Sequence, residues 1–303
     1  MKKVAFLNCI ESGHELLTHL LKENTKIDYI ISLTPTQAGK FNVSGYKDFS
    51  DISQQYNIPI YYPEQYNLSG EQDLEFFTQH KFDLMMVFGW QRLIPNSIID
   101  SLKIGALGAH GSSEPLPKGR GRSPINWSLI ENKTQFILHL FYIDPGVDSG
   151  DIIDFMKFDL NEWDTCHTAY HKVQICLRKM LLKNLDLILK GKIIATKQDH
   201  SRATYYPKRT PKDGIIDWKK TTKEIYNLVR AVTKPYPGAF TPNDHIMIWE
   251  TQPFDSRIPY PNTQPGEVIE VFNDGSFIVK TIDSTLYVTE YDSKKSIKVG
   301  DKL

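Results

Sequence analysis

The amino-acid sequence predicts an α/β protein. A Rossmann-like, mostly parallel sheet is expected in the N-terminal part, followed by a small β-rich C-terminal domain of the open-barrel (OB-like) kind. Short apolar runs alternate with helical patterns over the first 150 residues, which is typical of a parallel sheet covered by helices on both faces. A long amphipathic pattern comes next, and short strands with a tight turn fill the end of the chain. The length of 303 residues is consistent with two domains.

The N-terminal part contains several candidate strands with helical stretches between them. Two of these helices are expected at Gly13–Leu21 and Ile94–Leu102. The strands are expected at Lys3–Leu7, Tyr29–Leu33, Pro59–Tyr61, Leu84–Phe88, Ala106–Leu107 and Phe136–Tyr142. In sheets of this kind, ligands bind beyond the carboxyl ends of the strands. Because His110 follows one strand almost directly, we expect it in that crevice.

One longer helix is predicted over Thr165–Leu189, where apolar residues recur at three- and four-residue spacing. Asp164 or Thr165 is the expected N-cap, and Gly191 is expected to end the helix. The polar stretch Ile194–Thr210 is typical of a linker. The predicted division is a catalytic domain over 1–190, a linker over 191–210 and a small C-terminal domain over 211–303.

The C-terminal part is predicted to begin with a short amphipathic helix and to continue with strands. Thr221 and Glu224 have the spacing of a capping box, ahead of apolar residues at helical spacing. Asn273-Asp274-Gly275 is expected to form a tight hairpin turn between two of the strands. The strands are expected at Ile246–Trp249, Glu267–Val271, Phe277–Lys280 and Leu286–Thr289.

Composition argues against some partners and favours one compartment. The chain has 36 basic and 36 acidic side chains, so its net charge of +0 creates no global field that attracts nucleic acid. The three cysteines, Cys9, Cys166 and Cys176, follow no metal or disulfide spacing, which fits a reducing compartment. The first residues lack the apolar core of a signal peptide, and no apolar run approaches the roughly 18 residues of a membrane span. We therefore expect a cytoplasmic protein with no membrane partner.

The sequence lacks several common motifs for nucleotide and metal binding. The first predicted strand leads into NCIESGHE rather than GxGxxG, which gives a dinucleotide cofactor little support. The stretch KGRGR is not a P-loop, and GVDSGD lacks the acidic spacing of a calcium loop. His167 and His171 lie four residues apart, but exposed polar helix residues are the usual explanation of such a pair. No metal is expected.

Two segments carry residues suited to proton transfer. His110 follows one predicted strand, and the segment DPGVDSGDI (Asp144–Ile152), rich in carboxylates and glycines, follows another. A buried aspartate beside a neutral imidazole fixes its tautomer and stabilises its protonated form. The residues alone allow a catalytic His–Asp pair at the sheet, and they equally allow a structural histidine.

The segment HGSSEPLPKGRGRSPINW, followed by LFYIDPGVDSGDI, resembles the formyltransferases that use 10-formyltetrahydrofolate. The segments DLMMVFGWQRLIP, KRTPKDGIIDW and LVRAVTKPYPGAF are also similar to this family, so the resemblance covers nearly the whole chain. Within the family the chain is most similar to sugar N-formyltransferases, which are related to methionyl-tRNA formyltransferases. The matching positions in the two longest motifs are His110, Ser112, Leu116, Pro117, Arg120, Gly121, Pro124, Trp127, Asp148, Gly150 and Asp151.

The resemblance implies that a primary amine attacks the formyl carbon of 10-formyltetrahydrofolate, which is the co-substrate. His110 would then accept or relay the proton that the amine loses, and Asp148 would hold the imidazole and offset its positive charge. Two loops are implied as the walls of the folate pocket. The residues expected there are Phe88, Gly89, Trp90, Asp144, Gly146 and Val147.

Two positions depart from the family pattern. Gly108 stands where the family has an asparagine that stabilises the oxyanion, and the loop after Ser112 is two residues longer. Losing such a donor costs about 10²–10³ in rate. A backbone N–H, a water or another amide such as Asn126 could replace it. Otherwise the protein is slow, binds folate or a nucleotide without turnover, or hydrolyses formyl-folate.

The closest likeness implies a nucleotide-linked amino sugar as acceptor, a 4-amino-deoxy sugar of lipopolysaccharide or other glycan biosynthesis. Initiator methionyl-tRNA is the alternative, but a tRNA ligand asks for a basic face that zero net charge does not favour. Arg120 is expected to be structural, and a homodimer is expected by likeness only. The expected substrate contacts, whose arginine forks suit a diphosphate, are Ser112, Lys118, Arg122 and Arg209.

Overall fold

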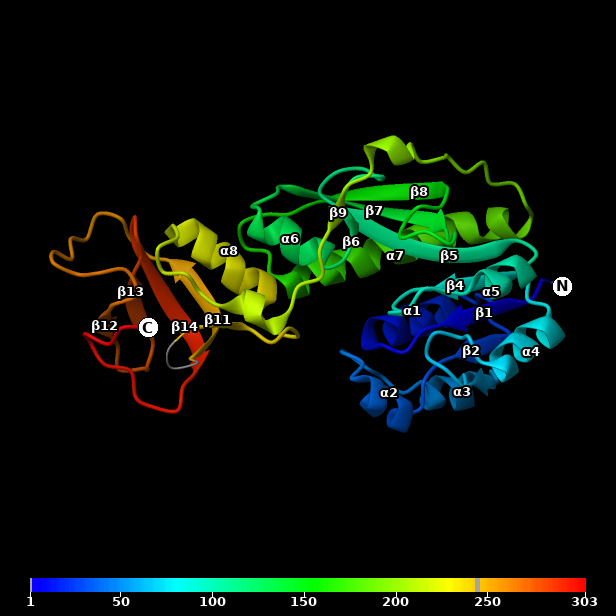
Figure 1. Cartoon of the computed structure of the whole chain (residues 1–303), viewed down its shortest axis with the longest axis horizontal. Helices are drawn as coiled ribbons and strands as arrows, with labels where there is room; N and C mark the ends of the chain where they lie inside the picture. Colours follow the sequence, from blue (N-terminus) through cyan, green and yellow to red (C-terminus); the bar gives the residue numbers. More distant parts are fainter. Residues whose placement is uncertain (1, 243–245) are drawn as a thin grey trace. The chain divides into compact units, whose positions relative to one another are not determined.

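The computed structural model describes residues 2–242 and 246–303 (Figure 1). The chain forms two compact units, and each unit combines segments that are far apart in the sequence. The first unit comprises Met1–Gly121, Ile137–Phe158 and Lys172–Tyr205, and the second comprises Arg122–Phe136, Asp159–His171 and Tyr206–Leu303. The division of the chain at residues 190 and 210 therefore stays a proposal from the sequence.

A seven-stranded sheet forms the centre of the first unit, in the order β3-β2-β1-β4-β5-β7-β8. The neighbours from β3 to β5 pair in parallel, whereas β7 pairs antiparallel with β5, which confirms the expected mostly parallel sheet. The strands are β1 (Val4–Leu7), β2 (Tyr29–Ile31), β3 (Ile60–Tyr61), β4 (Leu84–Val87), β5 (Gly105–Ser112), β7 (Gln135–Tyr142) and β8 (Ile152–Asp159).

Alternating side chains give this sheet two apolar faces. Val4 and Phe6 of β1 belong to a core that includes residues of α1, α3 and α7, whereas Ala5 and Leu7 belong to a second core with α4 and α5. The sheet is therefore covered by helices on both faces, as the sequence predicts. The helices are α1 (Glu11–Lys22), α2 (Pro35–Phe41), α3 (Ser50–Tyr56), α4 (Glu71–His80), α5 (Asn96–Ser101) and α7 (Cys166–Leu189).

Strand β5 is longer than the sequence indicated, and this changes the setting of His110. It spans Gly105–Ser112 instead of Ala106–Leu107, because its second half pairs with β7. His110 consequently lies within a strand and not in a loop beyond it. Strand β8 was not predicted either. Its residues are alternately exposed and half-buried, which is typical of the edge position that it takes in the sheet.

The ends of the long helix α7 agree with the predicted signals. Thr165 Oγ1 accepts a hydrogen bond from the Thr168 backbone N–H at 3.3 Å, so Thr165 caps the first turn. Gly191 adopts a left-handed φ of 65° just beyond the last turn. No helix among the described residues is long and apolar enough to cross a membrane.

A five-stranded antiparallel sheet, in the order β10-β11-β14-β13-β12, forms the centre of the second unit. Its closure into an open barrel stays a prediction. The expected turn at Asn273-Asp274-Gly275 joins β12 to β13, with Gly275 at a φ of 88°. The elements of this unit are α6 (Pro124–Ile130), α8 (Thr222–Val232), β10 (Ala239–Phe240), β11 (Met247–Pro253), β12 (Val268–Val271), β13 (Phe277–Lys280) and β14 (Thr285–Asp292).

Helix α8 begins at the predicted capping box. Thr221 Oγ1 accepts from the Glu224 backbone N–H at 3.2 Å, and the Glu224 carboxylate accepts from the Thr221 backbone N–H at 2.9 Å. Helix α6, which comes from a distant part of the sequence, is joined to α8 by the Asn126 side-chain amide, which donates to the Ala231 carbonyl at 2.6 Å.

Candidate active site

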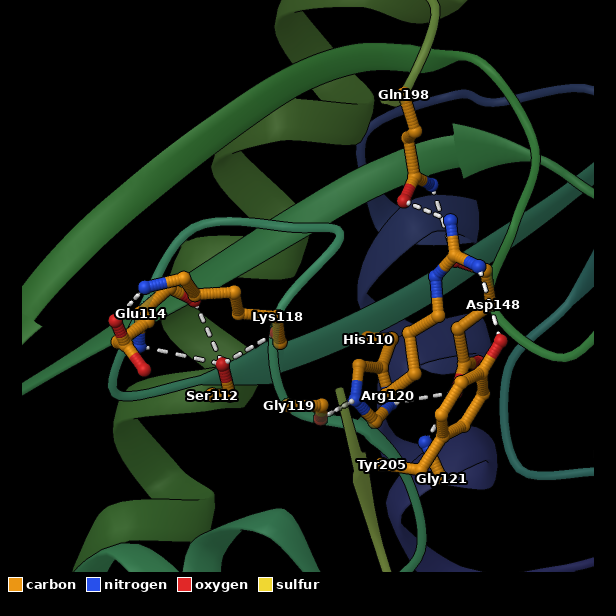
Figure 2. Close-up of polar contacts among 10 residues, drawn as sticks. All are labelled: His110, Ser112, Glu114, Lys118, Gly119, Arg120, Gly121, Asp148, Gln198 and Tyr205. Carbon is orange, nitrogen blue, oxygen red and sulfur yellow. Dashed lines mark hydrogen bonds and ion pairs between the residues drawn. The ribbon is translucent and has the colours of Figure 1, made fainter. Parts of the chain in front are cut away.

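His110 and Asp148, which the sequence analysis predicts to be a pair, lie next to each other in the structure (Figure 2). The His110 Nδ1 and Asp148 Oδ2 atoms lie 3.4 Å apart. The other ring nitrogen of His110, Nε2, lies 2.8 Å from the Gly119 carbonyl oxygen. A carbonyl oxygen can only accept, so Nε2 carries the hydrogen, and the lone pair of the neutral ring is on Nδ1. The basic nitrogen therefore faces the carboxylate.

This geometry corrects one detail of the expected pair. The group that fixes the tautomer of His110 is the Gly119 carbonyl, not Asp148. Asp148 is free to offset the charge that appears when Nδ1 takes a proton. His110 itself is 8% exposed, and the side chain of Asp148 is 20% exposed.

Asp148 is held by contacts along its backbone and at its carboxylate. Its φ of 51° lies in the left-handed region, which aspartate tolerates better than most residues. Its Oδ2 accepts from the Gly121 backbone N–H at 2.9 Å, and its carbonyl accepts from the Gln198 side-chain amide at 3.0 Å. The carboxylate is thus oriented before any ligand binds.

Gln198 belongs to a small buried network with Arg120 (Figure 2). Its Oε1 accepts from Arg120 Nη2 at 2.6 Å, and its Nε2 also donates to the Gly150 carbonyl at 2.7 Å. Arg120 is 2% exposed and also donates to the Tyr205 hydroxyl at 3.2 Å. The structural role expected for Arg120 is therefore observed. Gln198 was missed because it lies in the stretch expected to be a linker, where no local pattern marks it.

The 144–150 loop, which carries Asp148, is fixed by the Asp144 carboxylate and by a close backbone approach at Gly150. Asp144 Oδ1 accepts from the Gly146 N–H at 3.0 Å and from the Ser149 hydroxyl. A Cβ atom at Gly150 would lie 1.6 Å from the Tyr142 carbonyl oxygen, so only glycine fits there. This close approach sets the course of the loop out of β7.

The 113–119 loop is also fixed by side chains. Ser112 is 1% exposed, and its hydroxyl donates toward the carbonyls of Glu114 (2.6 Å) and Lys118 (3.0 Å). Lys118 Nζ forms an exposed ion pair with Glu114 Oε1 at 2.7 Å. Ser112 and Lys118 were expected to contact substrate, but in the structure both are engaged within their own loop.

A second histidine, His139, lies directly opposite His110 in the antiparallel register of β5 and β7. It is 2% exposed, and its Nε2 accepts from the Leu116 backbone N–H at 3.4 Å. Burial, with a smaller contribution from His110, lowers the pKa of His139 to about 4. His139 was not among the predicted site residues. Its only signal was a polar residue inside an apolar strand, and the pairing register was needed to place it.

The space at Gly108 is already filled. A Cβ atom there would lie 2.9 Å from Ile143 Cγ1 and 3.1 Å from the Phe141 ring, so an asparagine could not be accommodated without a shift. The amide of Asn126, one suggested replacement, donates to Ala231 within the second unit. Neither position supplies a free amide donor as the structure stands.

The residues expected around folate lie at the ends of β4 and β7. Phe88 and Trp90 are buried, and Gly89 between them has a φ of 108°. The Trp90 ring packs edge-on against Tyr66, with ring centroids 4.7 Å apart, and its buried Nε1 has no hydrogen-bond partner among the described residues. On the other loop, Val147 is 41% exposed.

The remaining two expected substrate contacts belong to the second unit. Arg122 is exposed, and its side chain forms no hydrogen bond or ion pair with the residues described. Arg209 lies over the Trp127 ring, 5.0 Å from its centroid, and donates to the Asp213 carbonyl at 2.6 Å. Burial lowers the pKa of Arg209. Within residues 2–242 and 246–303, no three metal-ligating side chains converge.

The fold and site define an α/β protein with a histidine–aspartate pair between two ordered loops, and comparison with known proteins identifies its family. The family profile described as "Formyl transferase" matches residues 2–185, and the one described as "Formyl transferase, C-terminal domain" matches residues 208–302. The chain belongs to the formyl transferase family, whose members are enzymes that transfer formyl groups.

The individual relatives carry two different names. Methionyl-tRNA formyltransferase of Clostridioides difficile (strain 630) is 30% identical over 306 residues, which cover 99% of this chain and 95% of the relative. The bifunctional polymyxin resistance protein ArnA of Wigglesworthia glossinidia brevipalpis is 34% identical over 202 residues, which cover 66% of this chain and 30% of that larger protein.

Among solved structures, an N-formyltransferase from Helicobacter canadensis, in complex with folinic acid and dTDP-3-aminofucose, is similar with a TM-score of 0.67. The identity is 21%, and the match covers 95% of this chain and 99% of that one. At this identity the likeness shows the fold.

Proposed function

We propose that this protein transfers a formyl group from 10-formyltetrahydrofolate to the primary amine of a nucleotide-linked amino sugar. The observation that carries the proposal is the His110–Asp148 pair, 3.4 Å apart, with the tautomer of His110 set by Gly119. Family membership supports the reaction, and the acceptor is supported by the similar N-formyltransferase structure in complex with dTDP-3-aminofucose. The proposed setting is the cytoplasm, in glycan biosynthesis, and a homodimer is proposed from family likeness alone.

The proposed mechanism follows from the tautomer. The co-substrate supplies the formyl carbon, and the attacking amine must lose a proton as its bond to that carbon forms. His110 Nδ1 carries the lone pair and accepts this proton. The imidazolium then lies 3.4 Å from the Asp148 carboxylate, which stabilises it electrostatically. The same proton can afterwards be delivered to the departing folate nitrogen.

The oxyanion of the tetrahedral intermediate has fewer donors here than in a site with an asparagine. Ile143 occupies the space beside Gly108, so the protonated Nδ1 of His110 is the donor that the pair itself provides. Removing one oxyanion donor typically costs about 10²–10³ in rate. We therefore expect a slow enzyme unless the acceptor or a bound water contributes a further donor.

The folate pocket is proposed between Phe88, Gly89 and Trp90 on one side and the 144–150 loop, with Asp144, Gly146 and Val147, on the other. The residues fit such a ligand in two respects. The buried Trp90 Nε1 is a donor without a partner among the described residues, and Val147 offers exposed apolar surface. A mostly apolar pocket with few polar contacts is the usual form of a cofactor site.

For the acceptor, Arg122 and Arg209 are the proposed diphosphate contacts. Arg122 has no partner among the described residues, and guanidinium forks match phosphate oxygens. Lys118 is paired with Glu114, and Ser112 is buried, so we assign both to the shape of the loop. Zero net charge does not favour a nucleic-acid acceptor.

Methionyl-tRNA is the second candidate acceptor, because relatives with that name match 99% of this chain. The two acceptors are separated by incubating the protein with 10-formyltetrahydrofolate and a panel of UDP-, GDP- and dTDP-linked 3-amino and 4-amino sugars, beside charged initiator tRNA. We expect tetrahydrofolate release with at least one amino sugar. Formylation of tRNA alone would overturn the choice of acceptor, and formate release without any acceptor would indicate hydrolysis. Folate binding without turnover would indicate a binding protein.

A further inference from the structure

A cavity of about 470 Å³ lies in the second unit, between α8, β11 and the chain around Glu162 and Trp163. Its volume is within the range of ligand sites, roughly 300–1,000 Å³. None of the residues assigned above to formyl transfer lines it. The site is thus separate in its residues from the proposed chemistry, and does not depend on it.

Aromatic rings line this cavity and are held in place. Trp249 Nε1 donates to Asp292 Oδ2 at 2.8 Å, and the Tyr226 hydroxyl donates to the Glu162 carbonyl. Trp163, in contrast, is 76% exposed, and its ring makes no hydrogen bond or ring contact with the described residues. Burial of an exposed indole ring is favourable, because it removes a large apolar area from water. A ligand that stacks on Trp163 would supply this burial.

The polar lining consists of groups that suit hydroxyl partners. Thr251 is 6% exposed, and its hydroxyl has no hydrogen-bond partner among the described residues, although a buried polar group is normally paired. Gln252 and Thr289 add an amide and a further hydroxyl. Hydroxyls and amides both donate and accept, so they match a ligand whose own groups are hydroxyls.

The charges on the lining cancel. Lys223 and Arg230 equal Glu162 and Glu250 in number, so the lining has no net charge. Arg230 already donates to the carbonyls of Asn161 and Asp164, both at 2.8 Å. A lining without net positive charge does not favour a phosphate over a neutral ligand. We propose that this cavity binds a neutral saccharide ring, whose C–H face lies on an indole and whose hydroxyls reach Thr251 and its neighbours.

The test uses the full-length protein and saturation-transfer NMR with methyl glycosides of neutral hexoses and N-acetylhexosamines. Thymidine, uridine and inorganic phosphate serve as competing probes. We expect at least one glycoside to bind with a Kd in the millimolar range or tighter. Trp163→Ala should weaken this binding by about tenfold or more, which corresponds to the loss of one stacking contact. Thr251→Val, which keeps the shape but removes the hydroxyl, should weaken it by about fivefold.

Phe155→Ala is the matched control, because Phe155 is a 61% exposed aromatic residue of the first unit. It should leave glycoside binding unchanged, and thermal unfolding should show that the Trp163 variant is folded. The proposal is wrong if no glycoside binds, if only nucleosides or phosphate bind, or if glycoside binding survives Trp163→Ala. Formyl transfer measured on the same samples keeps this outcome distinct from the proposed function.

Discussion

The two loops that meet at His110 are held in different ways. The 144–150 loop is held by the Asp144 carboxylate, which accepts hydrogen bonds within its own turn, and by Gly150, whose backbone lies against the Tyr142 carbonyl. The 113–119 loop is held by side chains, chiefly the Ser112 hydroxyl and the buried imidazole of His139. The first loop therefore requires the absence of a side chain at Gly150, and the second depends on the buried imidazole of His139.

The largest effect is expected at the point where the loops converge. His110→Asn removes the group that bonds to Gly119 of one loop and faces Asp148 of the other. Formyl transfer should fall by about 10²–10⁴-fold, the usual contribution of a general base. Steady-state kinetics with the best acceptor measures this, and circular dichroism checks folding. Near-normal turnover would contradict the assignment of His110.

Gly150→Ala should disrupt the 144–150 loop. The new Cβ would lie 1.6 Å from the Tyr142 carbonyl oxygen, so the loop must move. We expect the free energy of unfolding to fall by about 2–4 kcal/mol, as for other strongly disruptive substitutions, and formyl transfer to fall with it. Gly39→Ala is the control, since a Cβ there meets nothing within 4 Å. Denaturant titration of both variants compares them, and equal stability would show that the loop adapts.

Acid should destabilise the 113–119 loop. Burial lowers the pKa of His139 from 6.5 to about 4, so below pH 6.5 the unfolded chain takes up the proton before the folded protein does. The stabilising contribution of the neutral ring is complete above pH 6.5 and is lost as pH falls toward 4, by about 3 kcal/mol in total. Urea titrations across this range should show the loss in the native protein and a flatter profile in His139→Leu. If stability depends on pH in the same way in both proteins, His139 is not the group responsible.

The filled space at Gly108 gives a paired prediction. Gly108→Asn alone should destabilise the protein, because its Cβ would lie 2.9 Å from Ile143 Cγ1. Combining it with Ile143→Ala makes room for the amide, and we expect the rate of formyl transfer to exceed that of Ile143→Ala alone by about tenfold, part of what an oxyanion donor contributes. Single and double variants are compared by kcat. If the double variant has the same kcat as Ile143→Ala alone, or a lower one, the new amide does not reach the oxyanion.

The smallest effect is expected at Ser112. Ser112→Ala removes the one hydroxyl hydrogen that the Glu114 and Lys118 carbonyls share, which should lower the free energy of unfolding by about 1 kcal/mol. Ser97→Ala, at an exposed position outside both loops, should change it little. If Ser112→Ala instead raised KM strongly without affecting stability, a direct substrate contact would regain support.

The sequence indicated the class of fold and the His110–Asp148 pair, because both depend on local patterns: periodic apolar runs and two recognisable motifs. His139 and Gln198 could not be found in this way. The first is defined by a cross-strand register, and the second acts across a distance of 78 residues from Arg120. The need for glycine at Gly150 likewise arises from the approach of another strand's backbone, which no neighbouring residue signals.

The interleaving of the two units has a practical consequence for protein engineering. Exchanging C-terminal domains among relatives at a cut near residue 210 would leave α6 behind, although its Asn126 amide satisfies the Ala231 carbonyl of α8. A grafted domain would then meet a foreign helix at that contact. Working chimeras should therefore need the 122–136 and 159–171 segments to travel together with the C-terminal portion.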